Sequence, residues 1–298
     1  MWIRSSPNNP RRQNRRGENA RGTRYCRTTR SRHMLVPQPT IADCPVFIIG
    51  APRSGTSMLH WALCQHDALW GSEESDFLRP MIEGALTAYT EGTSRGDRHW
   101  LVREKVDKNE FLAHVGLGLN ALYTGHADGR RWVEQTPSYT LCADGLAQLF
   151  PTAQFLVLSR DGRQVVESSR AMMQLSHRRA CKWWRLYTDA ARDFQATHPE
   201  RCLQLRFEDL LVETAATLGR TFEFLGLEPI DAATKFITER EPINAAPGRA
   251  GESSGDKLAA RWHRWSGGQR RMFLRTCGPA LRRLGYEADD SWASGPRS

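Results

Sequence analysis

Short apolar runs alternate with helix-like stretches along this chain. Three runs of about strand length are Pro45–Ile49, Ala153–Ser159 and Cys202–Phe207, and the pair Trp132-Val133 indicates a further short strand. The first two are almost continuously apolar, which is typical of strands buried on both faces of a parallel sheet. The alternation predicts an α/β fold, a single domain with a parallel sheet flanked by helices.

Stretches with helical spacing separate the expected strands. The predicted helices are Thr56–Gln65, Leu78–Tyr89, His99–Tyr123, Tyr139–Phe150, Gly162–Met173, Asp209–Leu225 and Lys257–Gly285. Gly116 and Gly118 weaken the third of them, because glycine is a poor helix former. The small, polar stretch Ala245–Ser254 predicts a loop that can move over a site.

Charge is distributed unevenly over the 298 residues, whose formal net charge is +9. Residues 1–40 contain ten arginines and one acid, whereas the remaining 258 residues contain 32 basic and 32 acidic side chains. A basic chain often binds nucleic acid or membranes, but here the excess charge describes only a tail. We expect a disordered Arg-rich tail over residues 1–40, a domain over 41–287 and a flexible C-terminal tail over 288–298.

Three interpretations of the basic tail remain open. Translation starting at Met34 would remove it, the tail could contact RNA or anionic lipid, or it could be a transit peptide. We favour the first over nucleic-acid contact, and mass spectrometry of the native N-terminus distinguishes the three.

Other features of the composition exclude several classes of protein. No apolar run approaches the roughly 20 residues that a membrane span needs. The seven cysteines are scattered and lack CxxC spacing, and the nine histidines form no metal-ligand pattern. We therefore expect a cytoplasmic protein with neither a disulfide framework nor a bound metal.

A glycine-bracketed loop, Gly50-Ala-Pro-Arg-Ser-Gly-Thr-Ser57, joins the first strand to a helix. Backbone N–H groups at such a helix N-terminus converge on an anion. The pattern resembles a P-loop, except that Thr56 stands where a lysine contacts the β- and γ-phosphates, which argues against ATP or GTP hydrolysis. Arg53 supplies a cation instead. The residues expected to bind an anionic group are Arg53, Ser54, Gly55, Thr56 and Ser57. In the alternative, Gly50 and Gly55 merely permit a tight turn.

Two motifs carry a family resemblance. Pro52-Arg-Ser-Gly-Thr-Ser57 resembles the 5′-phosphosulfate loop of sulfotransferases that use 3′-phosphoadenosine 5′-phosphosulfate (PAPS). Leu158-Ser-Arg-Asp-Gly-Arg163, followed by Ser168, resembles the family's second motif. The resemblance implies that Arg160 and Ser168 bind the 3′-phosphate of the nucleotide. Otherwise Arg160 pairs locally with Asp161 and Ser168 lies on a helix surface.

The resemblance continues to residue 287. Leu205-Arg-Phe-Glu-Asp-Leu210 and Phe224-Leu-Gly-Leu227 are similar to the family's "RYEDL…FLGL" segment, whose residues we interpret as structural. Trp262 and Leu284-Gly-Tyr286 suit the family's last helices. The resemblance implies a P-loop-NTPase-like domain.

A general base is needed beside the loop, and Gly71-Ser-Glu-Glu-Ser75 offers Glu73 and Glu74. Acidic motifs of tyrosylprotein and heparan-type sulfotransferases imply that Glu74 is catalytic. Adjacent residues of an extended segment point to opposite sides, so we expect only Glu74 to face the site. A solvated acidic loop is the alternative.

Glu134-Gln-Thr-Pro-Ser-Tyr139 resembles the family's "EKTPSY" segment, with Gln135 in place of the catalytic lysine. Either another cation substitutes, with Arg131, Arg249 and Lys257 as candidates, or the enzyme is slow or inactive. Arg249 and Lys257 could also close over the 3′-phosphate.

Two further features are expected to be structural. We interpret His60 as a packing or surface residue, and at least one of Trp183 and Trp184 as a core residue, although the pair could shape an acceptor pocket.

The motifs together predict a PAPS-dependent sulfotransferase that needs no metal. Its acceptor could be a small molecule, a lipid, a glycan or a peptide tyrosine. One alternative is a P-loop kinase-like phosphotransferase, although the loop lysine is missing and no acidic Mg²⁺ ligand stands where one is expected. The other is a non-catalytic nucleotide- or RNA-binding protein.

Overall fold

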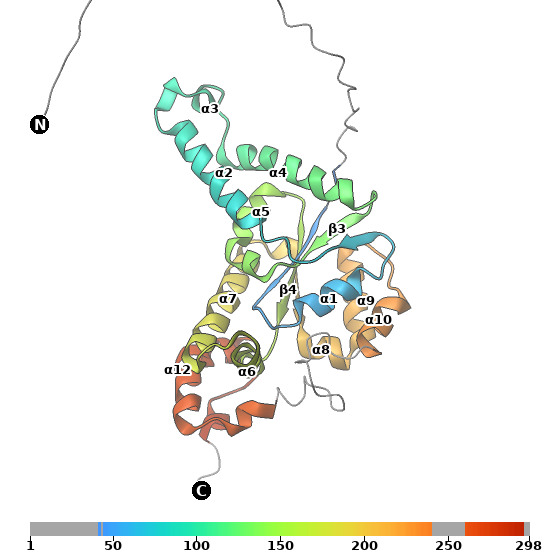
Figure 1. The fold of residues 1–298 in the computed structure, drawn as a ribbon, viewed down its shortest axis with the longest axis vertical. Coiled ribbons are helices and arrows are strands. Elements are labelled where there is room, and N and C mark those ends of the chain that lie inside the picture. The colour runs from blue at the N-terminus through green and yellow to red at the C-terminus, as the bar shows by residue number, and fades with distance from the viewer. Residues whose placement is uncertain (1–40, 43, 240–259, 295–298) are drawn as a thin grey trace, which may run out of the picture. The chain divides into compact units, whose positions relative to one another are not determined.

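The computed structural model describes residues 41, 42, 44–239 and 260–294, all within one compact unit, 39–298. Its five strands form one parallel sheet in the order β2-β3-β1-β4-β5. The strands are β1 (Val46–Gly50), β2 (Leu69–Gly71), β3 (Arg131–Glu134), β4 (Gln154–Ser159) and β5 (Cys202–Arg206). The predicted α/β fold with a helix-flanked parallel sheet is confirmed (Figure 1).

Alternating side chains of the central strands feed two separate cores. Phe47 and Ile49 of β1 belong to one hydrophobic cluster, whereas Val46 and Ile48 belong to another. Because successive side chains of a strand point to opposite faces, a continuously apolar strand must be covered on both.

Helices cover both faces of the sheet (Figure 1). The buried apolar residues also form a third cluster. The first core is covered by α2 (Leu78–Thr93), α4 (Lys108–His126), α5 (Ala143–Leu149) and α7 (His177–Thr197). The second is covered by α1 (Thr56–Leu63), α8 (Phe207–Val212), α9 (Thr214–Leu225) and α10 (Asp231–Thr238). The third cluster joins α7 to α6 (Gly162–Met173) and α12 (Gly267–Arg283).

Short helices complete the described chain. They are α3 (Trp100–Arg103) and the 3-10 turns Gly96–Arg98, Pro137–Cys142, Pro199–Arg201, Ala260–Arg264 and Ser291–Ser294. The last of these lies in the segment that we expected to be a flexible tail. Its Trp292 packs against Trp262 and Phe273, with ring centroids 5.5 and 5.7 Å apart.

Several elements differ from the sequence expectations. Strand β2 and helices α7 and α10 were not anticipated, although apolar residues at three- and four-residue spacing along α7 are a helix signal. The helix expected over His99–Tyr123 is interrupted: Lys105 has a φ of 59°, and the carboxylate of Asp107 caps α4 by accepting from the Glu110 backbone N–H.

Three other predicted helices are divided. Within Lys257–Gly285, Trp265 and Ser266 separate a 3-10 turn from α12. A 3-10 turn occupies the first residues of Tyr139–Phe150, and Glu213 separates α8 from α9 within Asp209–Leu225. The predicted tail, residues 1–40, and the loop Ala245–Ser254 lie outside the described residues. In the part of the chain that is described, no helix is both long and apolar enough to span a membrane.

Candidate functional site

The loop after β1 is shaped by two glycines. A Cβ on Gly50 would lie 2.3 Å from the carbonyl oxygen of Leu158 on β4, so only glycine permits this approach of the two strands. Gly55, with a φ of 95°, would place a Cβ 2.2 Å from the ring of Phe207. Arg53 lies between them with a φ of 73°, a conformation that non-glycine residues rarely adopt and that is frequent at ligand sites.

Polar groups of the loop remain without partners. Gly55 precedes α1 and provides no side-chain cap, and no acid lies in the first turn of the helix. The side chain of Ser54 is only 1% exposed, yet its hydroxyl has no hydrogen-bond partner among the described residues. Since an unpartnered buried polar group is costly, an anion that accepts from these groups would stabilise the loop. The residues therefore fit a phosphorylated or sulfated ligand.

Two arginines from distant segments meet beside this loop. The Nε of Arg53 donates to the Oγ of Ser168 at 3.1 Å, and the Nη1 of Arg160 donates to the backbone oxygen of Arg53 at 3.2 Å. The guanidinium of Arg160 lies 4.1 Å from the ring centroid of Phe207. Burial lowers the pKa of both arginines. The structure thus brings Arg53, Arg160 and Ser168 together at the carboxyl end of the sheet.

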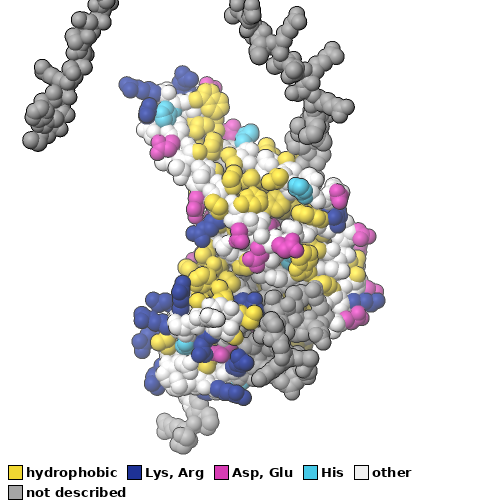
Figure 2. Space-filling model, viewed as in Figure 1, with side chains coloured by type: hydrophobic (Ala, Val, Ile, Leu, Met, Phe, Trp, Pro, Cys, Tyr) yellow, Lys and Arg dark blue, Asp and Glu magenta, His cyan; other side chains and the backbone are white. Residues whose placement is uncertain are grey.

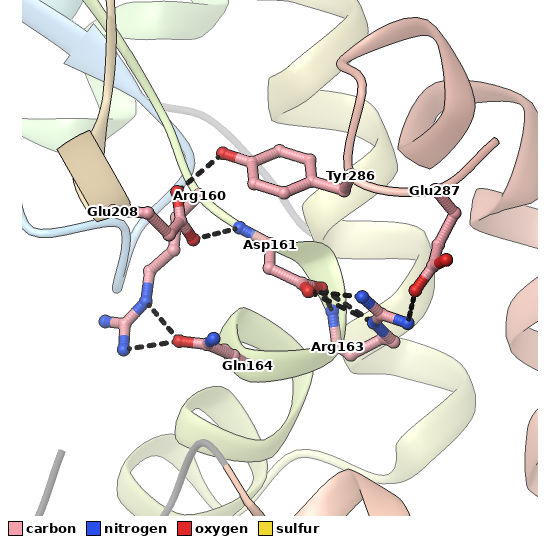
Figure 3. A network of polar contacts seen from close by, with 7 residues as sticks. All are labelled: Arg160, Asp161, Arg163, Gln164, Glu208, Tyr286 and Glu287. Atoms are coloured by element: carbon pink, nitrogen blue, oxygen red, sulfur yellow. Dashed lines mark hydrogen bonds and ion pairs between the residues drawn. The ribbon is translucent and has the colours of Figure 1, made fainter. Parts of the chain in front are cut away.

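Glu208 fixes the end of β4 (Figure 3). One carboxylate oxygen accepts from the backbone N–H of Asp161 at 3.0 Å, and the other accepts from the hydroxyl of Tyr286, also at 3.0 Å. Next to it, Arg163 forms ion pairs with Asp161 and Glu287. We expected the "RFEDL" segment to be structural, but no local pattern indicated that its Glu208 holds the end of β4.

Glu74 lies on the segment between β2 and α2. Its pKa is raised, first by burial and then by the nearby carboxylate of Asp76, while a hydrogen bond from Gln135 and the charge of Arg53 oppose the shift. A raised pKa suits a carboxylate that takes up a proton near neutral pH. Figure 2 shows acidic side chains near the middle of the face and basic ones mainly over α7 and α12.

A buried hydrogen-bond network holds the Glu74 segment in place. The backbone N–H of Ser75 donates to the Oγ1 of Thr136 at 3.0 Å, and the hydroxyl of Tyr123 donates to the Oγ of Ser75 at 2.7 Å. The carboxylate of Glu134 in turn accepts from the backbone N–H groups of Gln135 and Thr136. Sequence reasoning missed this role of Glu134, for which only its place in the "EQTPSY" segment was a signal.

Gln135 follows β3 and is 5% exposed. Its Oε1 accepts a hydrogen bond from the Oγ of Ser57 at 3.4 Å. Thr56, at the start of α1, is also buried. The residues predicted from the first loop, from the Glu74 segment and from the "EQTPSY" segment therefore lie next to one another.

Arg131 cannot replace the missing lysine, contrary to one of our expectations. Its guanidinium lies at the amino end of β3, where it donates to the backbone oxygens of Cys44 and Leu225. The other two candidates, Arg249 and Lys257, lie outside the described residues.

His60 and the tryptophan pair have structural positions. The side chain of His60 is fully buried, and burial lowers its pKa to about 4, so it is neutral at pH 7. Trp184 is buried beneath Gly162, while Trp183 is half-buried and stacks on Tyr187 at 5.5 Å. Among the described residues, no group of His, Cys, Asp and Glu side chains could hold a metal ion.

A parallel sheet whose central strand leads through a glycine-bracketed loop into a helix defines a P-loop-like α/β fold. The chain belongs to the sulfotransferase family, whose sequence pattern matches residues 45–231. The family resemblance found in the motifs is thereby confirmed.

Similar proteins include two curated relatives. Protein-tyrosine sulfotransferase A of Caenorhabditis elegans is 27% identical over 191 residues, which cover 61% of this chain and 50% of the relative. Protein-tyrosine sulfotransferase 2 of Gallus gallus is 24% identical over 263 residues, which cover 81% of this chain and 69% of the relative. The chain thus spans about half the length of the C. elegans protein.

A solved structure shares the fold. The sulfotransferase domain from the Synechococcus PCC 7002 olefin synthase has a TM-score of 0.51 and 21% identity. The match covers 77% of this chain and 91% of that domain.

Proposed function

We propose that this protein transfers a sulfonate group from PAPS to a hydroxyl or amine of an acceptor. The observation that carries the proposal is the hydrogen bond between Arg53 and Ser168, which lie 115 positions apart. Since Arg160 also donates to the backbone of the loop that contains Arg53, the two proposed anion-binding places would lie side by side. A nucleotide with a 5′-phosphosulfate and a 3′-phosphate has two anionic groups to fill them.

The loop residues would hold the 5′ end of the nucleotide. Arg53, Ser54, Gly55, Thr56 and Ser57 offer a guanidinium, hydroxyls and backbone N–H groups at the start of α1. Fixed donors of this kind stabilise charge that develops on a leaving group, because they need no reorganisation during the reaction.

The 3′-phosphate would lie near Arg160 and Ser168. A guanidinium can make two parallel hydrogen bonds to one phosphate, and the serine hydroxyl adds a third donor. In our proposal Arg249 and Lys257 contribute further cations from outside the described residues.

Glu74 would act as the general base. PAPS supplies the sulfonate group. The acceptor oxygen forms a bond to sulfur while its proton moves to the Glu74 carboxylate, and the bond between sulfur and the bridging phosphate oxygen breaks. The electron pair stays on that oxygen, where Arg53 and the N-terminus of α1 stabilise the charge.

The acceptor is proposed from the relatives. Both curated relatives described above are named protein-tyrosine sulfotransferases, which makes the phenolic hydroxyl of a peptide tyrosine the first acceptor to test. Small molecules, lipids and glycans are the alternatives, and we propose a cytoplasmic location.

Calorimetry tests the donor site. We expect 3′-phosphoadenosine 5′-phosphate to bind at least about tenfold more tightly than AMP, which lacks the 3′-phosphate contacts. Preference for ATP with Mg²⁺ would instead indicate a kinase-like phosphotransferase. A nucleic-acid-binding protein would instead bind nucleic acid only when residues 1–40 are present. It would not bind 3′-phosphoadenosine 5′-phosphate, which is also called adenosine 3′,5′-diphosphate.

Transfer of radiolabelled sulfonate from PAPS tests the reaction and the acceptor. A tyrosine peptide and the same peptide with phenylalanine form the first pair, and cell extracts follow as a source of other acceptors. Label that requires the tyrosine hydroxyl supports peptide-tyrosine transfer, whereas label on extract components alone identifies another acceptor class.

A further inference from the structure

Gln135 contacts both halves of the proposed site. On one side it accepts from Ser57 in the anion loop, at 3.4 Å. On the other it lies beside Glu74, the proposed base, whose neighbour Ser75 donates from its backbone N–H to the Oγ1 of Thr136 at 3.0 Å. With only 5% of its surface exposed, Gln135 has little water to compete for its amide.

The chemistry of the three groups fixes how the amide of Gln135 must be oriented to join Ser57 to Glu74. An ionised carboxylate only accepts, so the Nε2 of Gln135 must face Glu74. Its Oε1 is then left for Ser57, whose hydroxyl must donate. The result is a directed chain that runs from Ser57 through Gln135 to Glu74.

A neighbouring network makes this geometry rigid. The carboxylate of Glu134 accepts from the backbone N–H of Gln135 at 3.1 Å and of Thr136 at 2.9 Å. The Oγ1 of Thr136 also accepts from the backbone N–H of Ser75, next to Glu74. The turn that presents the amide and the segment that presents the carboxylate are therefore tied to the same two residues.

We propose that Gln135 is a positioning residue that couples the anion loop to the base, through the hydrogen-bond chain from Ser57 to Glu74. This inference rests on the proposed role of Glu74. A lysine at position 135 could donate to Glu74 but could not accept from Ser57, because an ammonium group has no acceptor atom. The amide thus replaces a charge contact by a relay, and Ser57 then binds the nucleotide through its backbone N–H while its hydroxyl donates to Gln135.

The relay has a readout that requires no substrate. Carbon-13 NMR titration of glutamate carboxyl groups in the full chain, assigned with Glu74→Gln, follows Glu74 directly. Removal of the amide with Gln135→Leu should raise the pKa of Glu74, because a donor to the charged form is lost. Ser57→Ala should raise it less, since it only weakens the polarisation of the amide.

A variant with both Gln135→Leu and Ser57→Ala shows whether the two residues act on the pKa of Glu74 through the same hydrogen-bond chain. With Gln135→Leu already present, Ser57→Ala should cause no further change in the titration of Glu74. Ser72→Ala is the matched control, because the Ser72 hydroxyl lies on the same segment and donates to the backbone oxygen of Glu73. The relay would be overturned if Ser57→Ala changed the pKa of Glu74 equally with and without the Gln135 amide. It would also be overturned if Gln135→Leu left the pKa of Glu74 unchanged.

Gln135→Lys adds a second test. A cation beside Glu74 should lower its pKa, and the effect of Ser57→Ala should vanish because lysine cannot accept from the hydroxyl. Persistence of the Ser57 effect in the lysine background would contradict the chain. Gln135→Met serves as a second uncharged variant where leucine disturbs folding.

Kinetics distinguish positioning from mere support of the fold. Gln135→Leu should lower kcat about tenfold and move the acidic limb of the pH profile to higher pH, with adenosine 3′,5′-diphosphate affinity kept within about threefold. Equal losses of affinity and kcat without a shifted limb would contradict positioning. If wild-type protein transfers no sulfonate, the proposed function fails, while the NMR titrations still decide the relay.

Discussion

The two ends of the sheet use arginine in opposite ways. At the amino end, Arg131 donates to the backbone oxygen of Leu225 at 2.8 Å, and Arg201 donates to those of Ala153 and Phe150 at 3.0 and 2.7 Å. At the carboxyl end, Arg53 uses its Nε for Ser168, and neither of its terminal nitrogens has an acceptor among the described residues.

Burial alone does not separate the two kinds of arginine. It lowers the pKa of Arg131 and Arg201 at one end and of Arg53 and Arg160 at the other. The difference lies in Arg53, whose terminal nitrogens remain free among the described residues, whereas Arg160 already donates to Gln164 and to the backbone oxygen of Arg53. An arginine whose donors are occupied by carbonyl oxygens holds the fold together, whereas one with free donors, next to an uncapped helix, attracts an anion.

The largest expected effect is on chemistry at the carboxyl end. Glu74→Gln should lower kcat about 1,000-fold, because an amide cannot take up the acceptor's proton. Affinity for adenosine 3′,5′-diphosphate should change little. Initial-rate assays and calorimetry measure the two, with Glu73→Gln as the control, and near-normal turnover of the Glu74 variant would remove Glu74 from its proposed role.

A change at the amino end should affect stability alone. Arg131→Met should lower the free energy of unfolding by about 3 kcal/mol, because buried carbonyl groups lose their donor. Urea unfolding measures it, and Arg98→Met, at an exposed position, is the control. Nucleotide affinity reduced in the folded Arg131 variant would contradict the division between the two ends.

The matching change at the carboxyl end should affect binding most, although Arg160 also donates to the backbone oxygen of Arg53. Arg160→Met should weaken adenosine 3′,5′-diphosphate binding about 30-fold, the size expected for lost charge-assisted hydrogen bonds. AMP binding should fall much less, and calorimetry compares the two ligands. The exposed Arg178→Met is the control. Equal losses for both nucleotides would show that Arg160 does not contact the 3′-phosphate.

The smallest expected effect is pH-dependent and involves neither set of arginines. Burial lowers the pKa of His60 from 6.5 to about 4. Between these two pH values the imidazole is protonated in the unfolded chain and neutral in the folded chain. Stability should therefore fall as pH drops below 6.5, by about 1.5 kcal/mol between pH 7.5 and 5.5.

His60→Gln isolates this contribution. Chemical denaturation of both proteins at pH 7.5 and 5.5 measures it, and the variant should lose less stability over this interval than the wild type. An identical pH dependence in the two proteins would show that His60 remains neutral in both states or charged in both.

The sequence predicted the site best where the residues of the site follow one another along the chain. The loop from Gly50 to Ser57 could be recognised because strand, glycines and helix follow one another. The apolar run of β4 likewise placed Arg160 at a strand end. Helix α7 was missed, although its spacing contained the signal. Arg131 was misjudged although it precedes the predicted strand Trp132-Val133, which Gln135 follows, so the two lie at opposite ends of that strand.

The sequence by itself determined the parallel α/β fold and the anion loop, because apolar periodicity and turn chemistry act over a few neighbouring residues. Only the tertiary structure decided that Arg53 meets Ser168, that Ser75 meets Thr136, and that Gln135 lies between Ser57 and Glu74. These contacts join segments far apart in the chain. Their partners are selected by packing of the sheet and its helices, which no local pattern encodes.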